Sequence, residues 1–188
     1  EDIDFNPDDF MARVNSDLVG KFVNIASRAV KFLPGGKLTA AAAEPGEVAL
    51  VQNVQALYEA RDYGRALRDI MAYADKVNLR FDGAAPWKLV KEGKADEAAV
   101  VCSLCIESFK VMTACLKPVL PILAGEAEAF LRCAPLDWSN AATALGVEQA
   151  LSHHPEQADA VRWGLAYVVE GSQLGAQVLY RGLASRLA

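Results

Sequence analysis

The sequence is short of the features that mark membrane and secreted proteins. It has no run of about 18 uncharged apolar residues, the length that would cross a bilayer. Its acidic start, EDIDFNPDDF, is unlike the basic opening of a signal peptide. The net charge of -5 argues against attraction of the whole surface to nucleic acid, although a local basic stripe would still bind it. With 53% hydrophobic residues in a chain of 188, these absences predict one or two globular domains in the cytoplasm.

Cysteine and histidine are too few and too scattered to indicate a metal site. Cys102 and Cys105 form a C-x-x-C pair, but no second pair follows at the spacing of zinc ligands. Both lie in the apolar segment VVCSLCIESF, so we expect them to be reduced core residues. His153 and His154 follow a serine and precede a proline, a pattern typical of a loop that leads into a helix. We therefore expect no metal ion.

The alternation of β-branched residues that marks strands is also missing, whereas apolar residues recur every three or four positions along most of the chain. Prolines and glycines divide the chain into predicted helices at about residues 7–33, 45–81 (one helix or two), 96–116, from Pro118 onward, and 155–186. Residues 134–146 are linker-like. The first helix carries an apolar stripe that should face a core: Met11, Val14, Leu18, Phe22, Ile25 and Ala29. The predicted fold is an all-α helical bundle.

Polar residues of the first predicted helix also form a stripe. Its members follow one another at steps of three or four, which places them on one helical face: Arg13, Asp17, Lys21, Asn24, Arg28 and Lys31. Periodicity favours a solvated face with ion pairs, such as Asp17 with Arg13 or Lys21. The alternative is a locally basic surface held out to a partner.

Trp87 follows Pro86 in AAPWKLV, where a short helix could begin with proline in its first turn. Such a tryptophan is usually a core anchor. If it is exposed beside Asn24 and Arg28, however, it offers a flat surface for an unstacked base and lies near donors for base edges and phosphates.

Four blocks within about residues 1–140 resemble, in order, the C-terminal anticodon-binding helical domain of bacterial methionyl-tRNA synthetases, a bundle of the class I aminoacyl-tRNA synthetases. They are DIDFNPDDFMARVNSDLVGKFVNIASR, DYGRALRDIMAYADKVN, APWKLVKEGKADEAAVVCS and LKPVLPILAGEAEAFL. The resemblance implies that Asn24, Arg28 and Trp87 recognise the CAU anticodon of methionine tRNA, with Trp87 stacking on a base. Lys21 and Lys31 are candidate phosphate contacts.

The catalytic signatures of that family, similar to HIGH and KMSKS, do not occur in the sequence. The resemblance therefore implies a tRNA-binding module with no catalytic residues and no activity alone. Its partners would be the anticodon stem-loop and, if the chain is an excised fragment, the catalytic domain of a synthetase.

The sequence after about residue 145 does not continue this resemblance. WGLAYVVEGSQLGAQVLYRGL is similar to the distal-helix segment of bacterial heme oxygenases, in which glycines let the backbone approach heme. Gly171, Ser172 and Gly175 would be the cofactor-facing small residues. No histidine lies on the N-terminal helix to ligate iron, so we favour an ordinary helix whose small residues admit a neighbouring helix.

Three hypotheses follow from this mosaic of two families. The first is an anticodon-binding module (residues 1–140) without a cofactor, carrying a linker and C-terminal helix (residues 141–188) packed on the bundle. The second is a heme-oxygenase-related oxidoreductase that binds heme. The third is a fused or engineered helical scaffold with neither activity.

Overall fold

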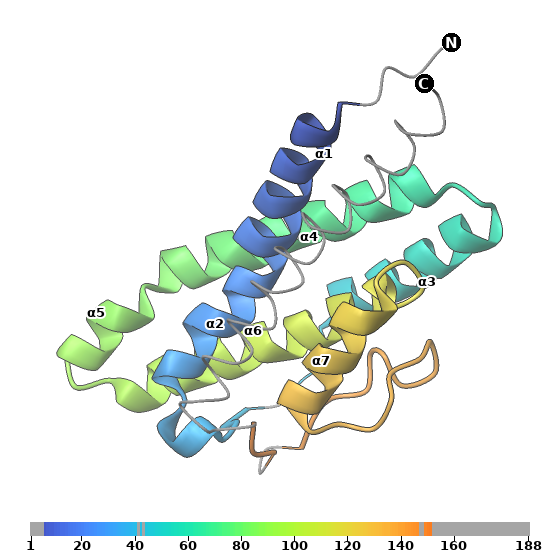
Figure 1. Cartoon of the computed structure of the whole chain (residues 1–188). Helices are drawn as coiled ribbons and strands as arrows, with labels where there is room; N and C mark the ends of the chain where they lie inside the picture. Colours follow the sequence, from blue (N-terminus) through green and yellow to red (C-terminus); the bar gives the residue numbers. More distant parts are fainter. Residues whose placement is uncertain (1–5, 41, 43, 147–148, 152–188) are drawn as a thin grey trace.

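The computed structural model describes residues 6–40, 42, 44–146 and 149–151, and these residues form a bundle of helices (Figure 1). The predicted helical architecture is confirmed, because the described residues contain no strand and only an isolated bridge between Lys37 and Ala150. The elements in order are α1 (Pro7–Val14), η1 (Asn15–Val23), α2 (Asn24–Ala29), η2 (Val30–Phe32), η3 (Pro34–Gly36), α3 (Pro45–Glu59), α4 (Tyr63–Ala84), α5 (Pro86–Lys91), α6 (Ala95–Leu116) and α7 (Pro121–Leu131).

Helix α6 is the centre of the bundle. Helices α2, α3, α4, α5 and α7 pack around it, and all of its residues from Cys105 to Leu116 are buried. Apolar side chains dominate this helix because little of it reaches water. By length and composition α6 would be able to cross a membrane, but 83% of its most apolar window is buried inside the bundle, as in the core helix of a globular domain.

The first helical run differs from the single α-helix predicted over residues 7–33. Residues Asn15–Val23 form a π-helix, in which each N–H bonds to the carbonyl five residues earlier, and Val30–Phe32 form a 3-10 turn. The sequence pattern assumed 3.6 residues per turn throughout, so it did not predict this change of pitch. Of the predicted core stripe, Phe22, Ile25 and Ala29 are buried, whereas α1 contributes no buried side chain.

The other helix boundaries follow local chemistry. Residues 45–84 form two helices, because Arg61 adopts a left-handed φ of 62° and the Asp62 carboxylate accepts a hydrogen bond from the N–H of Arg65 as α4 begins. The helix predicted after Pro118 is α7, which begins three residues further on, at Pro121. Either proline could occupy a first helical turn, where its missing N–H costs nothing. The predicted last helix lies outside the described residues.

Two buried charged side chains of α6 hold the segment that follows α7. The Nζ of Lys110 donates to the carbonyl oxygens of Asn140 (3.0 Å), Ala141 (3.2 Å) and Thr143. One turn earlier, Glu107 Oε1 accepts from the N–H of Leu145 at 2.7 Å. Both side chains are at least 96% buried. The linker-like segment predicted at residues 134–146 thus lacks helix but is attached to the core by specific hydrogen bonds.

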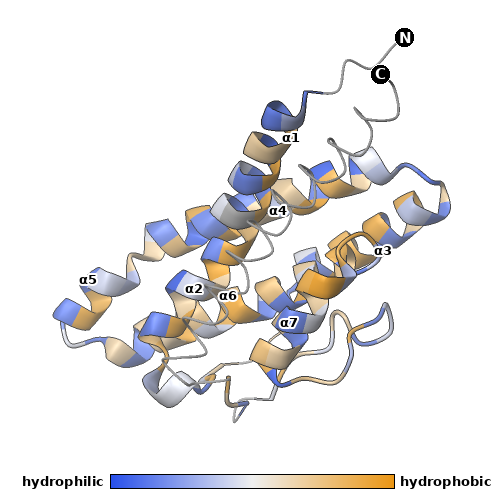
Figure 2. Ribbon diagram, in the orientation of Figure 1, coloured by the Kyte–Doolittle hydropathy of each residue, from blue (hydrophilic) through white to orange (hydrophobic). Residues whose placement is uncertain are grey.

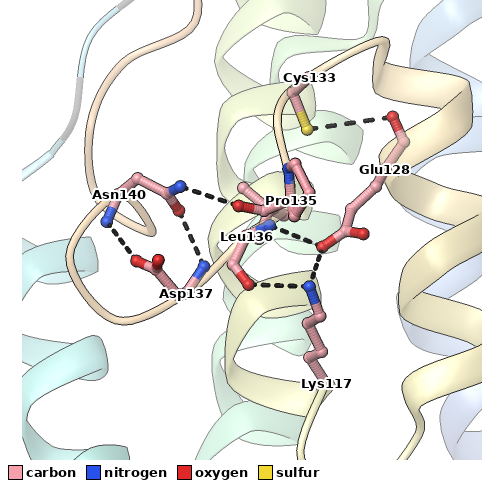
Figure 3. Close-up of polar contacts among 7 residues, drawn as sticks. All are labelled: Lys117, Glu128, Cys133, Pro135, Leu136, Asp137 and Asn140. Carbon is pink, nitrogen blue, oxygen red and sulfur yellow. Dashed lines mark hydrogen bonds and ion pairs between the residues drawn. The ribbon is translucent and has the colours of Figure 1, made fainter.

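A second set of hydrogen bonds between charged side chains and the backbone holds the start of this segment, at Leu136 (Figure 3). Glu128 of α7 pairs with Lys117 (2.6 Å) and accepts the N–H of Leu136 (2.7 Å), while Lys117 donates to the Leu136 carbonyl (2.9 Å). The next turn is closed by Asp137, whose carboxylate accepts the N–H of Asn140 at 3.1 Å. The hydrogen bonds to this carboxylate, above all from Ser139, lower the pKa of Asp137.

The buried position of Glu107 predicts a specific pH dependence. Desolvation raises the pKa of Glu107 from 4.5 to about 7, although the Leu145 N–H and the charge of Lys110 oppose the shift. The folded chain therefore binds this proton more tightly than the unfolded chain, and the stabilisation is lost as the pH rises from about 4.5 to about 7. Glu107→Gln keeps an acceptor for Leu145 but cannot ionise. We expect it to match the wild type near pH 5 and to be more stable by about 1–2 kcal/mol at pH 8.

Urea denaturation at a series of pH values measures this difference. Asp96→Gln, at an exposed position in the first turn of the same helix, is the control for loss of one carboxylate. A difference between Glu107→Gln and the wild type that does not change with pH would contradict the assignment of this titration to Glu107.

Cys102, Cys105 and Cys115 are buried and Cys133 is half-buried, which confirms the expected core position of the C-x-x-C pair. Burial raises the pKa of Cys102 to about 12 and raises that of Cys105 as well, so neither thiol is reactive at neutral pH. Within the described ranges, no group of three or more His, Cys, Asp or Glu side chains is placed to bind a metal ion. His153 and His154 lie outside those ranges.

Candidate nucleic-acid interface

The structure brings Arg28 and Trp87, which are distant in sequence, to the same aromatic side chain. The guanidinium carbon of Arg28 lies 4.3 Å from the centre of the Phe81 ring. The ring of Trp87 packs on Phe81 with 6.0 Å between centroids and an interplanar angle of 45°. Phe81 is 97% buried in α4, so it is a fixed base for both side chains.

Trp87 is neither a buried core anchor nor a fully exposed platform. Pro86 occupies the first turn of α5, as predicted, and the preceding Ala85 has a left-handed φ of 48° that redirects the chain between α4 and α5. Trp87 remains 38% exposed although its ring packs on Phe81. This arrangement leaves part of the indole surface available for stacking.

The position of the Arg28 guanidinium is set by two contacts with α4. Its Nη2 forms an ion pair with Asp82 Oδ1, and its plane lies over Phe81. An arginine has five N–H donors in a rigid fork. Among the described residues only Nη2 of Arg28 is paired, so donors remain for a ligand.

Asn24 lies one turn before Arg28 on α2. It is half-buried, and its carbonyl accepts a hydrogen bond from the hydroxyl of Ser27 at 3.2 Å. Within the described part of the chain the side-chain amide of Asn24 makes no hydrogen bond. Because an amide offers both donors and an acceptor, this group is suited to reading the edge of a base.

The two candidate phosphate contacts differ in their surroundings. Lys21 donates to Asp75 Oδ2 at 3.1 Å and lies 3.4 Å from Asp17 Oδ1, and the hydrogen bond to Asp75 is the main reason that its pKa is raised. The predicted Asp17–Lys21 pair is therefore confirmed. Its charge is already largely neutralised, which makes Lys21 a poor phosphate ligand. Lys31 is exposed in η2 and keeps its place as a candidate.

Sequence reasoning missed the three α4 residues that organise this surface, Asp75, Phe81 and Asp82. A signal for two of them was present. Asp75 and Asp82 are seven residues apart, as are Lys21 and Arg28, and the two opposite charges pair in the same order along two helices. Seven residues make about two helical turns, so two charges at this spacing on one helix can each pair with an opposite charge at the same spacing on a neighbouring helix. Phe81 had no comparable signal.

Comparison with solved structures shows which known protein has a similar fold. The fold matches Mycobacterium tuberculosis methionyl-tRNA synthetase in complex with methionyl-adenylate with a TM-score of 0.71 and 20% identity, over 80% of this chain and 33% of that one. No family model matches the sequence. At this level of identity the likeness is one of fold, over about a third of that chain.

Sequence similarity leads to one group of synthetases, the methionine-tRNA ligases. The chain is 49% identical over 157 residues to a methionine-tRNA ligase of Methylibium petroleiphilum and 49% identical over 155 residues to one of Herminiimonas arsenicoxydans. These matches cover 78% and 77% of this chain but 22% of each relative. The chain is homologous to a C-terminal segment of methionyl-tRNA synthetases and spans about a fifth of their length.

Gly171, Ser172 and Gly175, the small residues of the heme-oxygenase-like segment, lie outside the described residues. Their packing role and the heme hypothesis stay predictions.

Proposed function

We propose that this chain is a tRNA-binding module that recognises the CAU anticodon of methionine tRNA in the cytoplasm. The observation that carries the proposal is the contact of Arg28 and Trp87 with the same ring, Phe81, which supports a single site for stacking and base-edge hydrogen bonds. Homology to methionine-tRNA ligases supports tRNA as the partner.

The roles of the three side chains are separable. Trp87 stacks on an unstacked base, an interaction that every base accepts. Asn24 and Arg28 supply selectivity, because an amide and the free donors of a guanidinium pair with base edges in a defined geometry. Asp82 holds Arg28 in place and keeps this surface from attracting RNA by positive charge alone.

The chain acts as a binding module without ligase activity of its own. It spans about a fifth of its relatives, so aminoacylation requires the remainder of such a protein. The partners are the anticodon stem-loop and, in a longer protein, the catalytic domain.

Asn24→Ala and Arg28→Ala test base readout. We expect each variant to reduce the preference for a CAU stem-loop over a scrambled loop by about 10-fold, since a well-placed hydrogen-bonding pair contributes roughly 1–3 kcal/mol of discrimination. Fluorescence anisotropy with both loops at two salt concentrations measures the preference. The matched control is Lys76→Ala, an exposed cation on α4, which we expect to weaken binding to both loops equally or not at all.

Base readout should survive higher salt, because hydrogen bonds to base edges release no counterions. Equal, weak and salt-sensitive binding of the wild type to both loops would refute anticodon recognition and leave only electrostatic attraction.

A further inference from the structure

A third side chain packs on Phe81, the ring that Arg28 and Trp87 both contact. The ring of Phe32, in η2, lies with its centroid 6.1 Å from that of Phe81, at an interplanar angle of 52°. Arg28 and Phe32 are four residues apart, so one short stretch of the first helical run contacts the ring twice. The position of α2 over α4 therefore depends on Phe32 as well as on the ion pair of Arg28 with Asp82.

Helix α2 is short and has two different sides. It has six residues, and Figure 2 shows both polar and apolar ones along it. Ile25, Ala26 and Ala29 are buried, whereas Asn24 and Arg28 stay partly exposed. A small rotation of the helix would turn these two polar side chains away from a partner, so the contacts at its ends decide where they point.

The chain after Phe32 turns through two glycines. Both have a positive φ, 61° at Gly35 and 68° at Gly36, where η3 ends. Glycine adopts such angles at no steric cost, but it also leaves them easily because no side chain restricts its backbone. The turn therefore needs contacts from other parts of the chain to keep its shape.

Residues 149–151 supply two such contacts by forming an antiparallel bridge with the end of η3 and the chain that follows it. The N–H of Leu38 donates to the Gln149 carbonyl at 3.1 Å, and the N–H of Leu151 donates to the Gly36 carbonyl at 2.9 Å. The side chains of Leu38 and Leu151 are at least 98% buried. The bridge is therefore part of the core and joins the end of the first helical run to the segment that follows α7.

The side chain of Gln149 attaches this bridge to the end of α7. Its Nε2 donates to the carbonyl oxygens of Leu131 at 2.6 Å and Arg132 at 2.9 Å. Arg132 has a left-handed φ of 49° and ends the helix, so these carbonyls lack the helical N–H partners of the residues before them. Gln149 is thus joined to α7 by its side chain and to Leu38 by its backbone.

We propose that Gln149 is a positioning residue for the two base-reading side chains of α2. By holding the chain after η3 against α7, it keeps Phe32 on Phe81 and fixes the direction in which α2 presents its polar side. The inference rests on the proposed readout of bases by α2. It concerns selectivity and not total affinity, because Trp87 stacks from α5, a helix that packs mainly on α6.

Gln149→Met tests this role, because methionine fills similar space but has no N–H to donate to Leu131 and Arg132. We expect the preference for a CAU stem-loop over a scrambled loop to fall about 3- to 10-fold, while affinity for the scrambled loop stays that of the wild type. Gln149→Lys still donates to carbonyls at a helix end and should keep the wild-type preference. Anisotropy titrations with both loops measure these quantities.

Lys117→Met is the control for a loss of stability alone. It removes a hydrogen bond to the same segment after α7 at its other end, the carbonyl of Leu136. We expect this variant to be less stable than the wild type and to prefer the CAU loop as strongly. If it lowered the preference as much as Gln149→Met does, Gln149 would contribute stability only and the proposal would be wrong.

Measurements on the free protein separate this proposal from anticodon recognition itself. In Gln149→Met we expect the N–H groups of Leu38 and Leu151 to exchange at least about 10-fold faster. The NMR signals of the Arg28 side chain, which lies over the Phe81 ring, should shift as well. Unchanged exchange or unchanged Arg28 signals would overturn the positioning role even if the wild type prefers CAU. Shifted signals in a protein without that preference would instead refute the proposed function and leave the positioning of Arg28 standing.

Discussion

Trp87→Ala should weaken binding of a CAU stem-loop by about 5- to 150-fold, since stacking on one base contributes roughly 1–3 kcal/mol. A scrambled loop should lose a similar factor, because an indole stacks on any base. Trp87→Phe keeps an aromatic face and should recover most of the affinity. Anisotropy titrations of the three proteins against both loops measure these effects.

The control for Trp87→Ala is a neighbouring change that spares the ring. Val90 lies one turn further along α5 and is 44% exposed, so Val90→Ala should bind as the wild type does. Circular dichroism confirms that the variants fold, which matters because Trp87 also packs on Phe81. Unchanged affinity in Trp87→Ala would count against the proposed site and favour a helical scaffold that does not bind RNA.

Lys110→Met should lower the free energy of unfolding by about 3 kcal/mol, the size of effect seen when one member of a buried charged group is removed. The methionine fills similar space but donates nothing to the carbonyls of Asn140, Ala141 and Thr143. It also leaves Glu107 without the nearby positive charge. We expect the substitution to speed hydrogen exchange in residues 137–146 more than in α3 or α4.

A double-mutant cycle separates two effects of Lys110→Met, the loss of hydrogen bonds to the backbone carbonyls and the loss of a positive charge near Glu107. Adding Glu107→Gln removes the uncompensated carboxylate, so the double variant should regain part of the lost stability at pH 8. Lys117→Met is a comparison at the other anchor, because Lys117 holds Leu136 and Glu128 (Figure 3). If Lys110→Met is as stable as the wild type, the buried lysine does not hold this segment.

Much of the proposed site could be recognised from the sequence. Asn24 and Arg28 are four residues apart in a helical pattern, and the four-residue step puts them on one face whatever the rest of the chain does. Pro86 marked the start of α5 and placed Trp87 in its first turn. These features depend on local backbone geometry, which neighbouring residues determine.

The structure of the first run could not be predicted in the same way. A stripe of apolar residues at steps of three and four is compatible with α-helix throughout, yet residues 15–23 adopt the wider π-helix. Lys21 lies within that stretch and reaches Asp75, a residue 54 positions away. A contact of that kind depends on how two helices pack, and helical periodicity carries no information about it.

The sequence by itself determined the helical class, the positions of most helices, the core location of the cysteines and the polar stripe of the first helical run, because all of these follow from local spacing and from the burial of apolar side chains. Only the tertiary structure decided that Phe81 joins Arg28 to Trp87, that Lys21 is neutralised by Asp75, and that Glu107 and Lys110 hold the segment after α7. Each of these contacts joins residues from different parts of the chain, and their partners are fixed by the packing of helices around α6.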